Sequence, residues 1–217
     1  MSDIRSFVDT IFDELVSIRR DIHAHPELGM HEVRTSALIR SELEKMGVDE
    51  IRQPLPTAVV ALIHGKKGPG KCVALRADID ALPVHEETGL PFASETEGIM
   101  HACGHDLHTT MLLGAAKTLC HMRDQFAGTV KLIFEPSEDL MPGGARALVA
   151  AGVMENPHVP SSASMSAPLR MTPWAVCSSI RVTSPARWTC STSAFTARAA
   201  TALRPTPPVT PSPAPAT

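Results

Sequence analysis

Tyrosine is absent from the sequence, and aromatic residues make up only 4% of its 217 residues. Lysine and arginine (20) nearly balance aspartate and glutamate (23), so no positive excess favours nucleic acid or an acidic membrane surface as a partner. No run of about 18 apolar residues occurs, so the sequence predicts no membrane-spanning helix. Residues 2–20 carry charges throughout, unlike a signal peptide.

Disulfide spacing is also lacking. The cysteines lie far apart along the chain, at Cys72, Cys103, Cys120, Cys177 and Cys190. A disulfide-stabilised secreted domain has denser cysteines, so this spacing fits a reducing compartment. We therefore expect a cytoplasmic protein. We also expect Cys72 and Cys120, which lie in apolar contexts, to be core residues.

Hydrophobic residues make up 43% of the chain, which suits a globular core. Apolar residues at helical spacing predict helices, and short apolar runs predict strands. The predicted helices span residues 4–18, 35–46, 108–119 and 144–151, and the predicted strands span 58–63, 72–77 and 129–134. Gly47 fits the position that ends a helix. Helices that alternate with apolar strands favour an α/β layer fold.

The composition changes at residue 160. Residues 160–217 are rich in serine, threonine, proline and alanine, and they show no apolar periodicity. Proline removes backbone donors and fixes φ, so the last residues suit neither a helix nor the interior of a sheet. The simplest interpretation is a disordered tail that follows a folded part at residues 1–159.

The segment Met100–Thr110 concentrates groups that bind metals. Imidazole, thiolate and carboxylate side chains occur within eight residues, at His101, Cys103, His105, Asp106 and His108. Such groups bind Zn, Co, Ni or Mn ions. A single buried histidine or cysteine would be an ordinary core residue, but this density favours a metal site.

Two further segments place carboxylates after apolar strands. Asp78 and Asp80 are spaced i, i+2, which puts both on one face of an extended chain. Glu135, Glu138 and Asp139 follow the strand at 129–134. Carboxylates at these places can bind a metal ion or take a proton from metal-bound water. The alternatives to this interpretation are a turn with solvated aspartates for the first segment and an ordinary acidic loop for the second. Each of the three segments follows a predicted apolar strand, and in open α/β sheets ligands bind at that edge.

Four motifs in order resemble one family. HAHPELGMHE, RADIDALP, GIMHACGHDLHTTMLLGAA and IFEPSEDLMPGGA are similar to the aminoacylase and carboxypeptidase family of dinuclear metallo-hydrolases. The hippurate hydrolase and indole-acetyl-amino-acid hydrolase type is the most similar branch, and the resemblance covers about residues 12–159. It implies an incomplete catalytic domain with a mixed sheet flanked by helices.

The resemblance also implies roles for individual residues. Cys103, His105 and Asp139 match metal ligands, Glu138 matches the general base, and Asp80 matches the aspartate that supports the metal centre. Two divalent ions (Mn, Zn, Co or Ni) are implied. The family usually has Gln-Pro-Ala-Glu-Glu where this chain has Glu-Pro-Ser-Glu-Asp, so Asp139 is one methylene shorter than the usual glutamate. His23 and His25 are expected to be ordinary loop residues, although they could line the site entrance.

The family's two remaining histidine ligands and its second domain, which carries the dimer contacts, have no match in the sequence. Reading the codons of residues 196–206 one nucleotide earlier allows HGKGGHGSTPH, the family's signature at the start of that domain. The same shift allows AVFGIHVS at residues 160–167. We therefore interpret residues 160–217 as frameshifted by a small deletion near the codon of Val159.

These inferences predict metal-dependent hydrolysis of the amide bond of small N-acyl amino acids such as hippurate. They also predict that this chain is inactive in its present form. Two other hypotheses stay open: a non-catalytic truncated fragment, and a structural metal-binding module.

Overall fold

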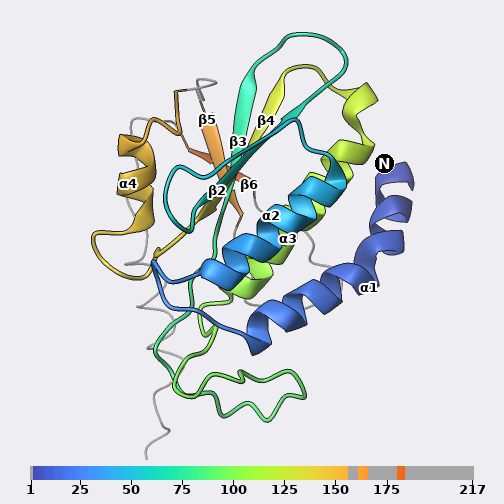
Figure 1. Cartoon of the computed structure of the whole chain (residues 1–217). Coiled ribbons are helices and arrows are strands. Elements are labelled where there is room, and N and C mark those ends of the chain that lie inside the picture. Colours follow the sequence, from blue (N-terminus) through green and yellow to red (C-terminus); the bar gives the residue numbers. More distant parts are fainter. Residues whose placement is uncertain (1, 156–160, 166–179, 184–217) are drawn as a thin grey trace, which may run out of the picture. The chain divides into compact units, whose positions relative to one another are not determined.

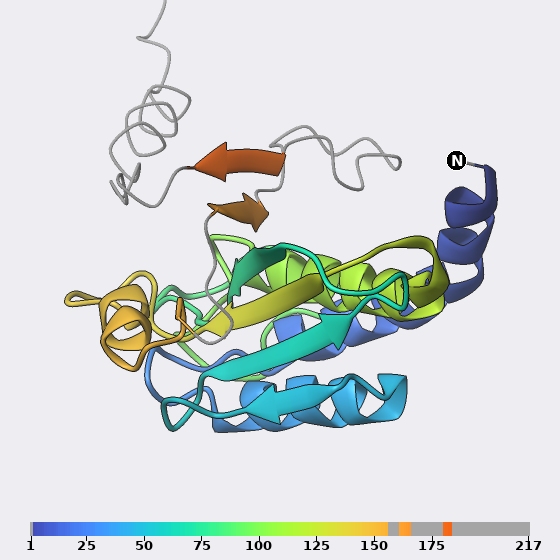
Figure 2. The same cartoon turned by 90° about the horizontal axis from the view of Figure 1, so that it is seen from above.

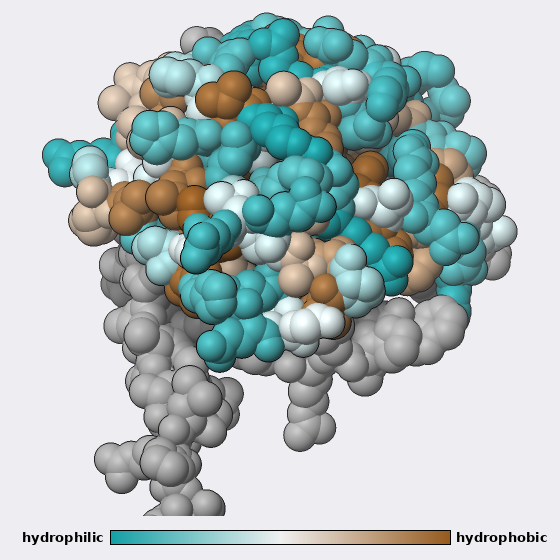
Figure 3. All heavy atoms as spheres, turned by 60° about the horizontal axis from the view of Figure 1, so that its bottom comes forward, coloured by the Kyte–Doolittle hydropathy of each residue, from teal (hydrophilic) through white to brown (hydrophobic). Residues whose placement is uncertain are grey.

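The computed structural model describes residues 2–155, 161–165 and 180–183, all within one compact unit, Met1–Pro185. The predictions of a disordered, frameshifted tail fall almost entirely outside the described residues. None of the helices in the described ranges is both long enough and apolar enough to cross a membrane. Hydrophobic residues on the face shown in Figure 3 lie in patches scattered among hydrophilic ones.

A mixed six-stranded sheet organises the described residues (Figure 1). β3 is parallel to both of its neighbours, β4 and β5, and the other neighbouring strands are antiparallel. In spatial order the strands are β1 (Glu50–Arg52), β2 (Val59–His64), β4 (Thr129–Glu135), β3 (Cys72–Asp78), β5 (Ser161–Met165) and β6 (Ile180–Thr183).

Helices cover the sheet on both faces (Figures 1 and 2). The described residues form the α-helices α1 (Ser2–Ala24), α2 (Val33–Met46), α3 (His105–His121) and α4 (Gly144–Ala150), and the short 3-10 helix η1 (Arg123–Gln125). α2 and α3 pack on one face and α1 packs on α3, whereas α4 contacts β4 from the opposite face. The predicted α/β fold with a mixed sheet is therefore confirmed.

Alternation along the strands divides the core into two clusters. Successive side chains of a strand point to opposite faces. Leu132 and Phe134 of β4 accordingly pack with α2 and α3, while Ile133 packs on the other face with Leu148 of α4. Because both faces are covered, β2 is a continuous apolar run from Val59 to Ile63. β4 is largely apolar, and its buried Lys131 donates a hydrogen bond from Nζ to the carbonyl oxygen of Val153. The short strand β1 lacks such a run and was not predicted.

The boundary of α1 corrects one prediction. We expected a loop at His23, but α1 continues to Ala24 because Ile22 is fully buried and extends the apolar face of the helix. Pro26 then follows, and it disfavours helical conformation in the preceding residue. Gly47, with φ of 64°, ends α2 as predicted.

The turn between β4 and α4 is very tightly packed. The backbone carbonyl oxygen of Pro136 lies where a side chain on Gly144 would begin: an added Cβ would be 1.8 Å from it. The Gly144 N–H also donates to the carbonyl oxygen of Ser137 (3.0 Å). Only glycine therefore fits at this position without moving the backbone.

We expect Gly144→Ala to lower the free energy of unfolding by about 1–3 kcal/mol, the usual cost of overpacking. Arg146→Ala, an exposed change in the same helix, should stay within about 0.5 kcal/mol of the parent. Urea unfolding followed by circular dichroism measures both. Equal stability of Gly144→Ala and the parent protein would show that the turn has room for a side chain.

Candidate metal centre

The paired ends of β3 and β4 bring two acidic residues together. Asp78 and Glu135 are register partners, and both are buried. Arg76 lies between them: its Nε donates to Glu135 (2.7 Å) and its Nη1 donates to Asp78 (2.9 Å). Glu135 was expected in a loop, but it is the last residue of β4 and is neutralised within the sheet.

His105 begins α3 and is held by Asp80. Its Nδ1 lies 2.9 Å from the Asp80 carbonyl oxygen and 3.1 Å from Asp80 Oδ1. Since both partners accept hydrogen bonds, Nδ1 carries the proton, and Nε2 of the neutral ring is the atom that can bind a metal. Burial alone would lower the pKa of His105, but the bond to Asp80 and the charge of Asp78 raise it to about 9.

The second oxygen of Asp80 reaches the loop after β4. The backbone N–H of Asp139 donates to Asp80 Oδ2 (3.1 Å). Asp80 is fully buried, and burial raises the pKa of its carboxyl group, but the hydrogen bond to His105, the charge of His105 and the backbone N–H donors of the loop together lower the pKa by more. One ionised carboxylate therefore fixes both His105 and Asp139.

Three of the predicted ligands converge at this point. One donor atom from each of Cys103, His105 and Asp139 lies within 4.8 Å of the others, and Cys103 Sγ is 3.9 Å from Asp139 Oδ1. Asp139 Oδ2 is buried, and no hydrogen bond to it is found among the described residues. Cys103 is exposed as a residue, but partial desolvation of its thiol, together with the charge of Asp139, raises the pKa of the thiol to about 12. A buried unpaired acceptor beside a thiol and an imidazole suits a divalent cation.

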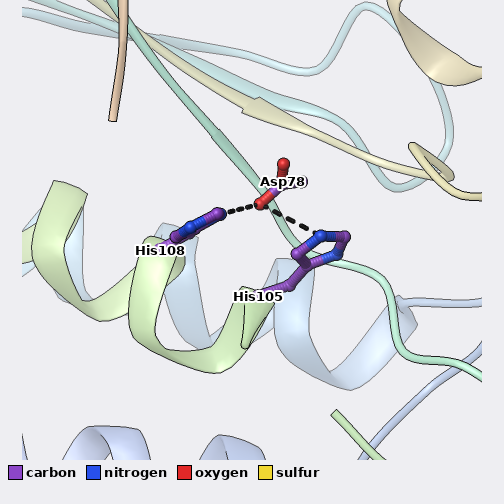
Figure 4. Close-up of side chains that lie close together, drawn as sticks. All are labelled: Asp78, His105 and His108. Atoms are coloured by element: carbon purple, nitrogen blue, oxygen red, sulfur yellow. Dashed lines mark hydrogen bonds and ion pairs between the residues drawn. The ribbon is translucent and has the colours of Figure 1, made fainter. Parts of the chain in front are cut away.

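A second group, Asp78, His105 and His108, shares the same histidine (Figure 4). Asp78 lies between the two rings and hydrogen-bonds to His108 Nδ1. Burial raises the pKa of Asp78, but this bond and the Arg76 charge hold it well below its usual range. Because Asp78 already has two partners, the group with Cys103 and Asp139 is the better cation site.

Glu138 lies at the edge of this site. Its Oε2 is 4.0 Å from His105 Nε2, and its side chain is partly buried. Burial, together with the negative charges of Asp78 and Asp139, raises the pKa of Glu138. A carboxyl group shifted toward neutral pH suits proton transfer.

The Met100–Thr110 segment does not act as one unit. Cys103 and His105 face Asp139, whereas His108 turns to Asp78 and Asp106 turns to α1. His101 is buried, and neither of its ring nitrogens has a hydrogen-bond partner among the described residues. The expectation that this segment directly follows a strand is wrong. A stretch without regular secondary structure separates it from β3, and α3 begins within the segment.

The sequence did not identify His23 as a buried polar residue with a structural role. Its Nδ1 is 2.8 Å from Asp106 Oδ2, and its Nε2 is 3.1 Å from Glu86 Oε1. Arg19 also pairs with Asp106 (2.7 Å). The bond to Asp106 raises the pKa of His23 despite its burial. The group ties α1 to the start of α3, so the interpretation of His23 as an ordinary loop residue is wrong.

The chain matches known proteins over most of its length. Residues 74–217 match the model of peptidase family M20/M25/M40. N-acyl-L-amino acid amidohydrolase of Geobacillus stearothermophilus is 42% identical over 167 residues, which are 77% of this chain and 45% of that protein. Thermostable carboxypeptidase 1 of Saccharolobus solfataricus is 51% identical over 153 residues, which are 70% of this chain and 39% of that protein.

A solved structure agrees. The Bacillus subtilis YXEP protein, called a dinuclear metal binding peptidase from the M20 family, superposes with a TM-score of 0.69 at 43% identity, over 74% of this chain and 44% of that one. The chain therefore belongs to peptidase family M20/M25/M40, and the family resemblance is confirmed. It spans less than half the length of these relatives.

We expect Co²⁺ added to the purified chain to produce a thiolate-to-metal absorption band in the near ultraviolet, because Cys103 Sγ belongs to the favoured donor group. Cys103→Ala should abolish the band. Cys120→Ala should retain it, because Cys120 packs beside the core away from that group. A band that survives in Cys103→Ala would place the metal elsewhere.

Proposed function

We propose that this chain carries part of the dinuclear metal centre of an amidohydrolase that cleaves N-acyl amino acids such as hippurate. The observation that carries the proposal is the convergence of Cys103, His105 and Asp139 in front of Asp80, with Glu138 beside them. The amidohydrolase and carboxypeptidase names of relatives support an amide substrate.

Each residue has a distinct role in this proposal. Cys103, His105 and Asp139 hold divalent cations (Mn, Zn, Co or Ni). Asp80 orients His105 and Asp139. When bound, the ions supply Lewis acidity for the scissile carbonyl and the attacking water. Glu138 accepts the proton of that water and delivers it to the leaving amine, which its raised pKa favours.

A purely structural metal module is the second candidate. Structural zinc sites are closed by four protein ligands, whereas catalytic sites keep a position open. Cys103 is exposed, and Glu138 stands beside the donor group without belonging to it. These two features favour a catalytic centre. The cytoplasmic location stays a prediction.

We propose, in addition, that the 217-residue chain has little or no activity by itself. The two candidate donor groups among the described residues share His105, whose Nδ1 is already bonded to Asp80. A pair of ions, each needing about four ligands, therefore requires more donors than these groups offer. The reading-frame hypothesis supplies further histidines at residues 160–167 and 196–206, which lie outside the fully described part of the chain.

Sequencing the coding DNA from the codon of Glu155 onward tests the reading-frame hypothesis. We expect a missing base or short deletion near the codon of Val159, with the earlier frame open well past the last codon of the present chain. Confirmation of the present frame, together with an early stop in the alternative one, would make a non-catalytic role the leading hypothesis.

The activity proposal is tested by measuring release of glycine from N-benzoylglycine in the presence of Mn²⁺. We expect negligible turnover by the present chain and ready turnover by the frame-restored protein. In the restored protein, Glu138→Gln should lower kcat about 10²–10⁴-fold while metal binding persists, as expected for loss of a general base.

Glu87→Gln, an exposed change, serves as the matched control and should leave the rate unaltered. Turnover by the 217-residue chain close to that of a full-length relative would contradict its proposed inactivity. An unimpaired Glu138→Gln enzyme would remove Glu138 from the role of base.

A further inference from the structure

A buried glutamate outside the metal centre contacts the loop that carries Glu138 and Asp139. Glu32 precedes α2 and is completely buried. Its Oε2 accepts a hydrogen bond from Thr57 Oγ1 (2.7 Å), and its Oε1 accepts one from the backbone N–H of Ser137 (2.8 Å). Burial raises the pKa of Glu32, and these bonds partly offset the shift.

Ser137 has an unusual backbone conformation. Its φ is 55°, in the left-handed region that residues other than glycine rarely adopt. Neighbouring groups surround it: its carbonyl oxygen accepts from Gly144 N–H (3.0 Å), and a Cβ on Gly29 would lie 2.6 Å from its Oγ. Such a conformation persists where the surroundings fix it, and it occurs often at functional sites.

The conformation of Ser137 determines where the next two side chains point. Glu138 and Asp139 follow it directly, and the N–H of Asp139 bonds to Asp80. This dipeptide is therefore held at both ends by buried carboxylates: Glu32 acts through the N–H of Ser137, and Asp80 acts through that of Asp139. If the first bond is lost, the Pro136–Ser137 peptide loses its hydrogen bond, while the bond from Gly144 N–H still restrains the Ser137 carbonyl. A change in the Ser137 backbone conformation then displaces both functional side chains.

We propose that Glu32 is a positioning residue for the metal centre, one that holds Ser137 in the left-handed conformation and thereby aims Asp139 at the cation and Glu138 at the water. The inference rests on the proposed function. Glu32 touches none of the reacting atoms. Its effect should therefore appear in metal affinity, which a role limited to stability would leave unchanged.

The test compares variants that remove the bond to Ser137 N–H with one that removes only the bond to Thr57 Oγ1. Glu32→Leu removes both bonds, and Glu32→Asp is one methylene too short to reach both partners. Glu32→Gln keeps an oxygen for Ser137 N–H and offers an amide N–H to Thr57 Oγ1. Thr57→Val, the matched control, breaks only the bond that does not lead to the loop.

The readouts are the Co²⁺ dissociation constant, measured by titration of the purified chain, and the melting temperature of the metal-free protein. We expect Glu32→Leu and Glu32→Asp to weaken Co²⁺ binding about 10–100-fold, the usual range for groups that orient ligands. Glu32→Gln should bind within a few-fold of the parent. Thr57→Val should lower the melting temperature and leave the affinity unchanged.

The outcomes separate this inference from the proposed function. If the parent chain binds Co²⁺ and both Glu32→Asp and Glu32→Leu bind it as tightly as the parent does, the role of Glu32 is overturned and the metal centre stays in place. Loss of affinity in Thr57→Val equal to that in Glu32→Asp also overturns it, since stability alone would then explain both. A parent chain that binds no Co²⁺ overturns both proposals. If Glu32→Leu does not fold, the contrast between Glu32→Asp and Glu32→Gln decides.

Discussion

The carboxylate of Asp80 is the interaction on which the site depends. One oxygen bonds to His105 at the start of α3, and the other bonds to the N–H of Asp139 in the loop after β4. These segments lie far apart in sequence, and the Asp80 side chain hydrogen-bonds to both of them. A buried carboxylate with partners on both oxygens is costly to disturb, because removal of either partner leaves an acceptor unsatisfied. The relative placement of His105 and Asp139, two of the proposed metal ligands, therefore follows from the ionisation and burial of one residue.

Parallel pairing of β3 and β4 makes this contact possible. Parallel strands end at the same edge of a sheet, so the segments that follow them emerge side by side. The pairing also brings Asp78 next to Glu135, and Arg76 compensates for the charge of both. The sheet edge thus separates carboxylates that are neutralised for structure from the carboxylate of Asp139, which retains an unpaired oxygen for a cation.

The sequence was informative where a signal is local. Apolar runs located the central strands, and the density of metal-binding residue types before a helix located Cys103 and His105, which the structure brings together with Asp139. The roles of His23 and Glu32 could not be read in this way. Their partners, Asp106 and Ser137, lie 83 and 105 positions away, and a hydrogen bond between distant residues leaves no periodic trace. The loop prediction at His23 failed because a nearby proline and polar residues outweighed the single apolar residue, Ile22, that continues the helix.

The long sequence separation between Glu32 and Ser137 also affects how the chain folds during its synthesis. A ribosome makes about 5–20 residues per second, so about 5–20 seconds pass between synthesis of Glu32 and of its partner 105 positions later. Throughout that interval no Ser137 N–H is present to donate a hydrogen bond to Glu32. Burial of Glu32 at that stage would leave one carboxylate oxygen unsatisfied. Docking of the segment around Glu32 is therefore coupled to the arrival of β4 and its loop. The edge that carries the proposed metal centre is thus completed late in synthesis, once Ser137 is available to pair with this carboxylate.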